Sequence, residues 1–160
     1  MLSRSQKTSP FSISHKVFFN ETNAVGGVVY FSNYIKWQGI AREEYFVSTV
    51  PEWRDIVADV SQGRLNMMTV EEHSYFLNHA FFGDTVEIQL QTINIRSYSF
   101  IMLFVISNQK HERLYEGMQK LAFDDFQGNY VKIPPPMLKS VRERQYQGDV
   151  SEFKKLKLYL

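Results

Sequence analysis

One long helix followed by strands is the pattern that most constrains the fold of this chain. From Tyr30 to Pro51, aromatic and apolar residues recur at steps of three and four positions, and the proline ends the segment. The members of this stripe are Tyr30, Tyr34, Trp37, Ala41 and Tyr45. After Pro51, a short helix is expected at 53–60. One main helix before a strand-rich remainder predicts an α+β fold with an antiparallel sheet against the helix.

Four strand-like runs make up the remainder. They lie at about 65–76, 84–96, 98–108 and 113–126. Val86, Ile88 and Leu90 alternate with polar residues, as expected for a strand with one solvated face. The run 100–106 is apolar on both faces, so we expect it at the centre of the sheet or at a contact between subunits. One further strand is predicted at 15–19.

The two ends of the chain differ from this middle part. Residues 1–12 are mostly polar, and we expect them to be disordered. After the prolines at 134–136, a mixed apolar and charged segment at 137–147 predicts a surface helix. Residues 148–160 fit either an extra edge strand or a solvated tail. The folded domain is therefore expected at 13–147.

Composition narrows the classes of function. The 160 residues, 44% of them hydrophobic, fit one domain with an ordinary core. A net charge of +1 with scattered Lys and Arg gives no electrostatic case for a nucleic-acid partner. The chain has no Cys, which excludes disulfides and thiol chemistry. Because it has no long apolar run and no hydrophobic signal core, we expect a cytoplasmic protein without a membrane partner.

Neither a metal nor a cofactor is predicted. The histidines lack the spacing of a known ligand motif, and isolated strand histidines are mostly structural. They are His15, His73, His79 and His111. The pair Gly26-Gly27 belongs to neither a dinucleotide fingerprint nor a P-loop.

The segment before the long helix has the features of a site. Asn23 begins a loop in which Gly26 and Gly27 allow backbone conformations closed to other residues. Tyr30 opens the helix, so its amide is one of the first-turn N–H groups without an intrahelical partner. Such a helix end suits an oxyanion.

The same segment resembles the hot-dog-fold thioesterases of the 4-hydroxybenzoyl-CoA thioesterase type, whose loop reads roughly D-x-x-G-x-V-Y-F-x-N-Y. Its sequence, ETNAVGGVVYFSNYIKWQGIARE, is most similar to thioesterases that accompany iterative enediyne polyketide synthases. Those carry E-T-N, N-Y-L-R-W-Q-G and C-R-E. The later phrases FFGDTVEI and LYEGMQKLAF also look like hot-dog strands, so the resemblance covers about 14–136.

The resemblance implies an antiparallel hot-dog sheet wrapped around the helix, and a homo-oligomer, a dimer of dimers. It places the site at the dimer interface, where the loop of one chain faces helix residues of its partner. The implied reaction is hydrolysis of a polyene or β-ketoacyl thioester on the acyl carrier protein domain of a polyketide synthase, with loss of carbon dioxide as an optional later step. No cofactor is implied.

Two residues of the motif carry the expected chemistry. Asn23 occupies the position where many hot-dog thioesterases place a catalytic Asp, and an amide is neither a nucleophile nor a base at pH 7. Hydrolysis must then lack the usual acid–base contribution of ~10²–10⁴ in rate, and Asn23 is expected to orient water. Arg42 matches the functional arginine of C-R-E and is expected to bind the thioester oxygen. By default, Asn23 would be a turn residue and Arg42 a solvated charge.

The remaining expected site residues have secondary roles. The Tyr30 backbone N–H is expected to stabilise the oxyanion, and Thr69 to line the acyl channel. Tyr34 is expected to line it too, with core packing as an equal alternative. Glu43 would supply the missing base only if it pointed inward among apolar residues. Further motif residues expected to bind substrate are Gly26, Gly27 and Asn33.

Departures from the enediyne pattern keep other functions open. Gly27 stands where those relatives usually have Asn, Ala41 where they have Cys, and His79 near an acidic position. One alternative is a generic acyl-CoA thioesterase. Another is a non-catalytic acyl-binding hot-dog protein, since the catalytic Asp is missing. If the substrate is carrier-bound, the basic candidates for docking an acidic carrier are Lys36, Lys139, Arg142 and Arg144.

Overall fold

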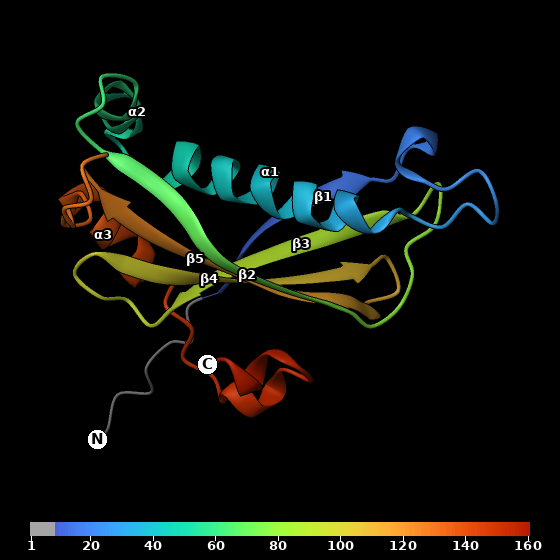
Figure 1. Cartoon of the computed structure of the whole chain (residues 1–160). Helices are drawn as coiled ribbons and strands as arrows, with labels where there is room; N and C mark the ends of the chain where they lie inside the picture. The colour runs from blue at the N-terminus through green and yellow to red at the C-terminus, as the bar shows by residue number, and fades with distance from the viewer. Residues whose placement is uncertain (1–8) are drawn as a thin grey trace.

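The computed structural model describes residues 9–160, so most of the predicted N-terminal disorder lies outside the described residues. One antiparallel sheet has five strands in the order β1-β3-β4-β5-β2. The strands are β1 (Phe11–Lys16), β2 (Asn66–Phe76), β3 (Thr85–Ile93), β4 (Ser99–Asn108) and β5 (Arg113–Asp124). The helix α1 (Phe31–Thr49) lies across one face of this sheet (Figure 1). The predicted α+β architecture is confirmed, and β4, which contains the apolar run 100–106, is the central strand.

The first strand is displaced from its predicted position. It begins at Phe11 rather than at His15, and both Phe11 and Ser12, expected to be disordered, pair with β3. Its alternate side chains are half-buried and exposed, which a strand with one covered face requires. Phe18 and Phe19, expected within the strand, follow it and are 57% and 67% exposed. The period-two alternation of Phe11–Lys16 therefore marks the strand better than the apolar pair Phe18-Phe19 does.

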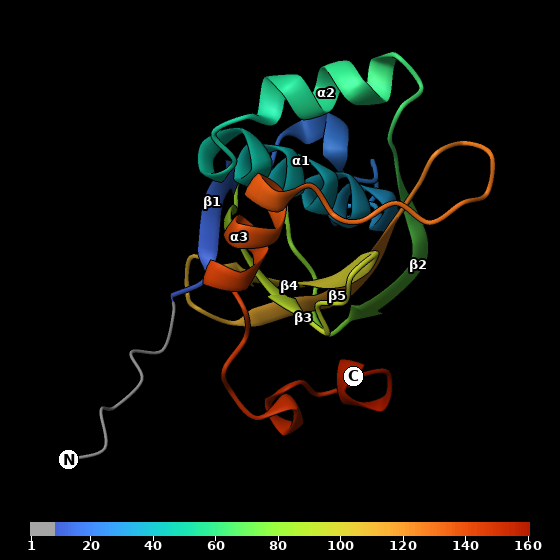
Figure 2. The ribbon, with the colours of Figure 1, turned by 90° about the vertical axis from the view of Figure 1, so that its left-hand side faces the viewer.

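The aromatic stripe packs α1 onto the sheet. Trp37, Ala41 and Tyr45 are fully buried, and the core beneath them includes Phe100 and Phe104 of β4. Two shorter helices, α2 (Trp53–Ser61) and α3 (Pro135–Glu143), flank the C-terminal end of α1 (Figure 2). The α3 helix buries Met137, Ser140 and Val141.

The C-terminal segment covers the other face of the sheet (Figure 2). It contains two 3₁₀ turns, η2 (Val150–Glu152) and η3 (Leu156–Leu158). The apolar cluster on this face consists of Ile101, Leu103, Met118, Phe153 and Leu156. Glu116 of β5 is fully buried and accepts hydrogen bonds from the backbone amides of Lys154 at 2.9 Å and Lys155 at 3.1 Å. The segment is thus neither an edge strand nor a solvated tail, because Glu116 and the apolar cluster hold it in place.

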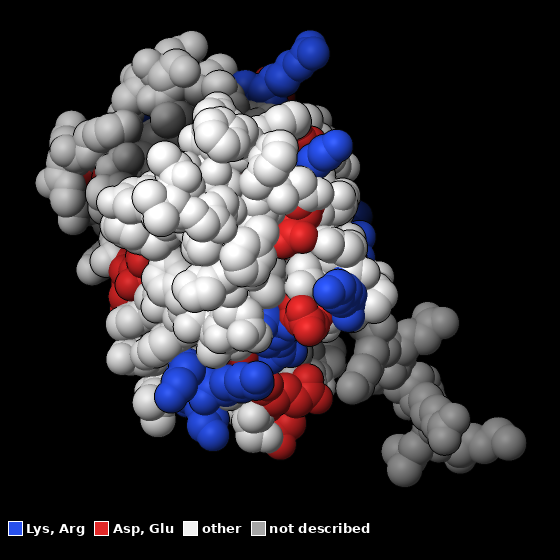
Figure 3. All heavy atoms as spheres, turned by 90° about the vertical axis from the view of Figure 1, so that its right-hand side faces the viewer, with Lys and Arg blue, Asp and Glu red and all other residues white. Residues whose placement is uncertain are grey.

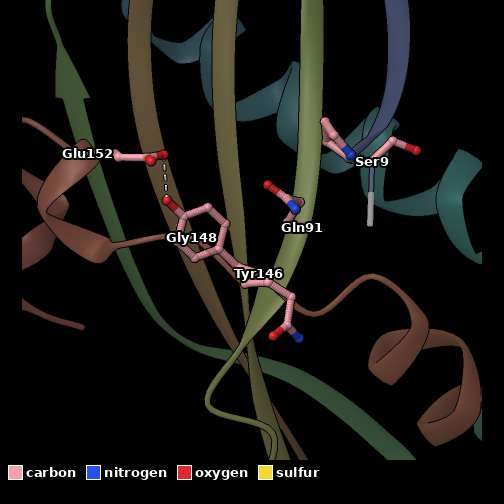
Figure 4. A pocket seen from close by; sticks show the side chains of 7 residues that line it. Ser9, Gln91, Tyr146, Gly148 and Glu152 are labelled. Carbon is pink, nitrogen blue, oxygen red and sulfur yellow. Dashed lines mark hydrogen bonds between the residues drawn. The ribbon is translucent and has the colours of Figure 1, made fainter. Parts of the chain in front are cut away.

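A pocket of about 240 Å³ lies where this segment meets the start of β1 (Figure 4). Ser9, Gln91 and Gly148 line it together with Tyr146, whose hydroxyl donates a hydrogen bond of 2.8 Å to Glu152. Burial and the neighbouring Glu152 carboxylate raise the pKa of Tyr146 to about 12. None of the predicted site residues lines this pocket, so it belongs to the docking of the C-terminal segment.

Candidate functional site

The loop before α1 is fixed by the buried carboxylate of Glu21. This residue is 7% exposed, accepts hydrogen bonds from the Phe18 amide at 2.9 Å and Trp37 Nε1 at 2.8 Å, and contacts His15 Nε2 at 2.9 Å. Burial alone would raise the pKa of Glu21, but these bonds outweigh burial and lower it. The carboxylate therefore joins the end of β1, the loop and α1.

The backbone carbonyl of Glu21 fixes the start of α1 as well. It accepts the Tyr30 amide at 2.9 Å and Asn33 Nδ2 at 2.8 Å. Contrary to expectation, the Tyr30 amide is therefore not a free donor for an oxyanion. The next two amides, of Phe31 and Ser32, have no hydrogen-bond partner among the described residues. Through this hydrogen bond, Asn33 holds the loop to the helix.

The glycine loop projects from this anchor. The Asn23 amide donates to the Val28 carbonyl at 2.8 Å, and the Asn23 side chain is exposed. Gly26 and Gly27 have φ values of +83° and +63°, in the left-handed region that residues with a Cβ rarely adopt. The Gly27 carbonyl accepts the Phe82 amide at 2.9 Å, which ties the loop to the β2–β3 connection. Both glycines thus shape the loop, while the Asn23 side chain is available to a ligand.

Tyr34 is a packing residue in this chain. It is 2% exposed, its ring stacks on Tyr115 at 5.4 Å between centroids, and its hydroxyl accepts the Ala80 amide at 2.9 Å. Burial raises the pKa of Tyr34. Because the phenol is buried and hydrogen-bonded, the core-packing alternative fits the structure better than a catalytic role.

Arg42 and Thr69, which are far apart in the sequence, meet between α1 and the edge strand β2. Arg42 Nη1 donates to Thr69 Oγ1 at 3.0 Å and to Gln119 Oε1 of β5 at 2.9 Å. Burial lowers the pKa of Arg42, but a guanidinium stays protonated in proteins. Glu43 is exposed and does not point inward. Sequence reasoning found Arg42 and Thr69 but missed Gln119, which no local pattern marks.

A second polar group continues along the same boundary. Gln38 of α1 is fully buried and its Nε2 donates to Tyr115 Oη of β5, which is in hydrogen-bond contact with Ser74 Oγ of β2. Ser74 Oγ donates in turn to Glu72. The carbonyl oxygen Gln38 Oε1 is buried without a partner in the described part of the chain. We call these seven residues the helix–edge seam; its members are Gln38, Arg42, Thr69, Glu72, Ser74, Tyr115 and Gln119.

Gly117 allows the seam to close. A Cβ at this position would lie 2.6 Å from Cε1 and 2.8 Å from the hydroxyl of Tyr115. Any larger residue would displace the phenol that joins Gln38 to Ser74. The motif phrase LYEGMQKLAF thus contributes Tyr115, Gly117 and Gln119 to one wall of the seam.

Comparison with known proteins assigns this architecture to a family. Residues 17–143 match the model of the thioesterase-like superfamily, which is most of the chain. The chain belongs to the thioesterase-like superfamily. The hot-dog fold predicted for it is therefore confirmed, and a thioester hydrolase is the activity that this membership favours. No curated protein matches the sequence significantly.

Solved thioesterases share the fold over nearly their whole length. The dynemicin thioesterase, whose structures describe polyene binding, is 25% identical with a TM-score of 0.77, over 87% of this chain and 99% of its own. The 1,4-dihydroxy-2-naphthoyl-CoA thioesterase of Synechocystis is 18% identical with a TM-score of 0.74, over 82% and 95%. A gentisyl-coenzyme A thioesterase is 21% identical with a TM-score of 0.68, over 82% and 98%. The last two show the fold alone.

In this hot-dog chain the predicted site residues form two clusters rather than one. The helix start at Phe31 and the seam residue Arg42 are separated by eleven positions of α1, or ~16 Å at 1.5 Å per residue. The loop with Asn23 lies at the first cluster and Thr69 at the second. One thioester carbonyl cannot reach both clusters of the same protomer.

The loop end of the molecule is largely free of charged side chains (Figure 3). The loop, the start of α1, the end of β2 and the β2–β3 connection lie at this end (Figure 1). These segments carry exposed aromatic rings. They are between 47% and 67% exposed and comprise Phe18, Phe19, Phe31, Phe76, Phe81 and Phe82. Such a concentration of exposed rings is unusual unless something apolar binds there.

Two further observations concern ligands and membranes. Within residues 9–160, no group of three or more His, Asp or Glu side chains is arranged to hold a metal ion. In the same part of the chain, no helix is long and apolar enough to cross a membrane.

Proposed function

We propose that this member of the thioesterase-like superfamily hydrolyses a polyene or β-ketoacyl thioester carried by an acyl carrier protein domain. The observation that carries the proposal is the Arg42 guanidinium, which is held by Thr69 and Gln119 at the open edge of the sheet. The likeness to the dynemicin thioesterase, at 25% identity over 87% of the chain, supports a polyketide substrate. The loop sequence with Asn23 supports the same class.

The chemistry assigned to Arg42 is electrostatic. Both of its hydrogen bonds come from Nη1, and a guanidinium has five N–H groups. The other donors can bind the thioester carbonyl oxygen and strengthen as negative charge develops on it. Thr69 and Gln119 fix the guanidinium in advance, so little reorganisation is needed during the reaction.

The edge strand β2 suggests how the two clusters come together. It pairs only with β5, and its middle residues from Met68 to Glu72 are exposed, which leaves a long unprotected edge. Thr69 contacts Arg42, whereas Phe76, at the other end of the strand, packs on Phe31 with 6.4 Å between ring centroids. Antiparallel pairing of β2 with a second copy, about a two-fold axis near its middle, would bring the partner's helix start to Arg42 of this chain.

A homodimer of this kind is therefore the minimal unit of the proposed enzyme, and the resemblance favours a dimer of dimers. Asn23 and the Phe31 and Ser32 amides from one protomer would face Arg42 from the other. Asn23 would orient the attacking water, and the exposed rings of the loop would contact the apolar acyl chain. A β-keto acid released in this way can lose carbon dioxide afterwards.

Mass spectrometry of products tests this function directly. The protein is incubated with a polyene-loaded synthase and, separately, with the corresponding acyl-CoA. Free acid released from the loaded carrier, with little from CoA, is the expected result. Release from acyl-CoA alone would indicate the generic acyl-CoA thioesterase instead, and bound but unhydrolysed acyl chains would indicate the acyl-binding protein.

A further inference from the structure

Glu72 places a carboxylate inside the helix–edge seam. It lies opposite Gln119 in the register of β2 and β5, and Gln119 is the residue that binds Arg42. Side chains directly opposite in an antiparallel pair have Cβ atoms ~4.5–5.5 Å apart. Within the described residues no ion pair joins Glu72 to a cation, so its charge is not neutralised by Arg42.

A directed chain of hydrogen bonds ends at this carboxylate. Gln38 Nε2 donates to Tyr115 Oη, and Ser74 Oγ donates to Glu72 Oε1, so the Tyr115 hydroxyl is left to donate to Ser74 Oγ or to Glu72 Oε1. Tyr115 Oη also lies 3.5 Å from Glu72 Oε1. Burial raises the pKa of Tyr115, which keeps the phenol protonated as a donor. The carboxylate is thus oriented from the buried side of the seam.

The other carboxylates of this region are unsuited to act on a substrate. Glu21 is buried and saturated with donors, and within residues 9–160 no hydrogen bond ties the Glu43 side chain to the seam. Asn23 replaces the acidic residue of the loop with an amide. Glu72 is different, because its second oxygen, Oε2, makes no hydrogen bond within residues 9–160 and the side chain stands at the open edge.

From this arrangement we infer that Glu72 is the general base of the site; the inference rests on the proposed thioesterase function. The carboxylate takes a proton from water while the water oxygen bonds to the thioester carbonyl carbon. The negative charge that develops on the carbonyl oxygen faces Arg42. When the carbonyl re-forms, the carbon–sulfur bond breaks and the thiolate takes the proton from Glu72, so one water is consumed and one acid and one thiol are released.

Substitution of Glu72 by Gln, with the neighbouring Glu71→Gln as a matched control, tests this role. Glu71 sits on the same strand but on its other face, opposite Lys120, and is hydrogen-bonded to His73. With a soluble thioester, Glu72→Gln should lower kcat by ~10²–10⁴ and abolish the acidic limb of the pH–rate profile, while Glu71→Gln should match the wild type. Wild-type turnover and an unchanged acidic limb in Glu72→Gln would overturn the inference.

Ser74→Ala provides a second readout that does not depend on the first variant folding. Loss of the Ser74 donor, which orients the carboxylate, should lower kcat by about tenfold, as for one hydrogen bond of about 1–1.5 kcal/mol, while leaving KM near that of the wild type. A wild-type kcat in Ser74→Ala would contradict the orienting contact on which the role of Glu72 rests.

These results separate the inference from the function on which it rests. If the wild type hydrolyses no thioester, carrier-bound or CoA-bound, the proposed function itself fails. If the wild type is active and both variants behave like it, only the role of Glu72 fails.

Discussion

At the start of α1 the polar groups of Glu21 are fully used, whereas at Arg42, three turns further along, donors remain available. The Glu21 carboxylate binds His15, Phe18 and Trp37, all from the same protomer. Arg42 uses only Nη1, and Gln38 in the same seam has a buried carbonyl without a partner in the described residues. Polar groups whose hydrogen bonds are all made within the protein stabilise the fold. Polar groups with unused donors or acceptors can bind a substrate. In the proposed function, the loop anchor therefore serves stability and the seam serves the chemistry.

Among the variants that compare the loop anchor with the seam, Arg42→Ala should give the largest effect, because it removes the cation of the seam and leaves the loop anchor intact. The loss of one preorganised oxyanion donor typically costs ~10²–10³ in rate. We expect a fall in kcat of that order. The far-UV circular dichroism spectrum of the variant should equal that of the wild type. Arg42→Lys should restore only part of the rate, since the planar fork is lost. Arg54→Ala, at an exposed position on α2, is the control; full turnover by Arg42→Ala would remove the seam from the mechanism.

Glu21→Gln should act on stability. The bonds that Glu21 receives are made to a charged group, and such bonds contribute about 1.5–3 kcal/mol each. We expect a loss of that order in the free energy of unfolding at neutral pH, measured by urea denaturation. Because the folded-state pKa of Glu21 is lowered below its ordinary value of 4.5, this stabilisation is present above that pH and is lost as the pH falls through the folded pKa.

The difference between wild type and Glu21→Gln should therefore shrink in acid. Glu52→Gln, at an exposed position that makes no side-chain cap bond, should unfold like the wild type at every pH. Equal free energies of unfolding for Glu21→Gln and wild type at neutral pH would show that the loop does not depend on this carboxylate.

Carrier docking should show the smallest effect. Lys139 and Arg142 are exposed on α3, and surface charges act mainly on association rate and are screened beyond about 8–10 Å at physiological salt. Raising the salt concentration should slow hydrolysis of the carrier-bound substrate by on the order of tenfold at most, with little change for an N-acetylcysteamine thioester. Charge reversal at Lys139 and Arg142 should mimic salt, and reversal at Lys110, in the exposed β4–β5 turn, should not. Equal salt sensitivity of both substrates would argue for a CoA substrate.

Sequence periodicity predicted the parts of the fold that depend on local pattern. The strand predicted at 113–126 is observed as Arg113–Asp124, and the helix predicted at 53–60 as Trp53–Ser61. The first strand begins four residues before the predicted position, because Phe18 and Phe19 are apolar and yet lie outside the strand. The C-terminal segment was misjudged since its packing depends on Glu116, a buried acid on a distant strand.

The site was predicted only in part for the same reason. Arg42 and Thr69 came from the family motif, and the structure brings them together. Glu72 and Gln119 have no motif, and they join the site only because β2 and β5 pair in one register. The Tyr30 amide was expected to be free, but the Glu21 carbonyl, nine positions earlier, accepts it. Contacts between segments that are distant in the sequence therefore decide which polar groups remain available to a ligand.

Complementation between two impaired variants tests the central claim most directly, namely that the seam of one protomer works with the loop of another. Arg42→Ala and Asn23→Ala are each prepared, then unfolded, mixed in equal amounts and refolded together. Asn23→Ala alone should lose about tenfold in rate, as expected for one hydrogen bond of about 1–1.5 kcal/mol. In a random mixture half of the dimers are mixed, and each mixed dimer has one intact site, so about a quarter of wild-type activity should return. Activity no higher than the average of the two variants would contradict the account.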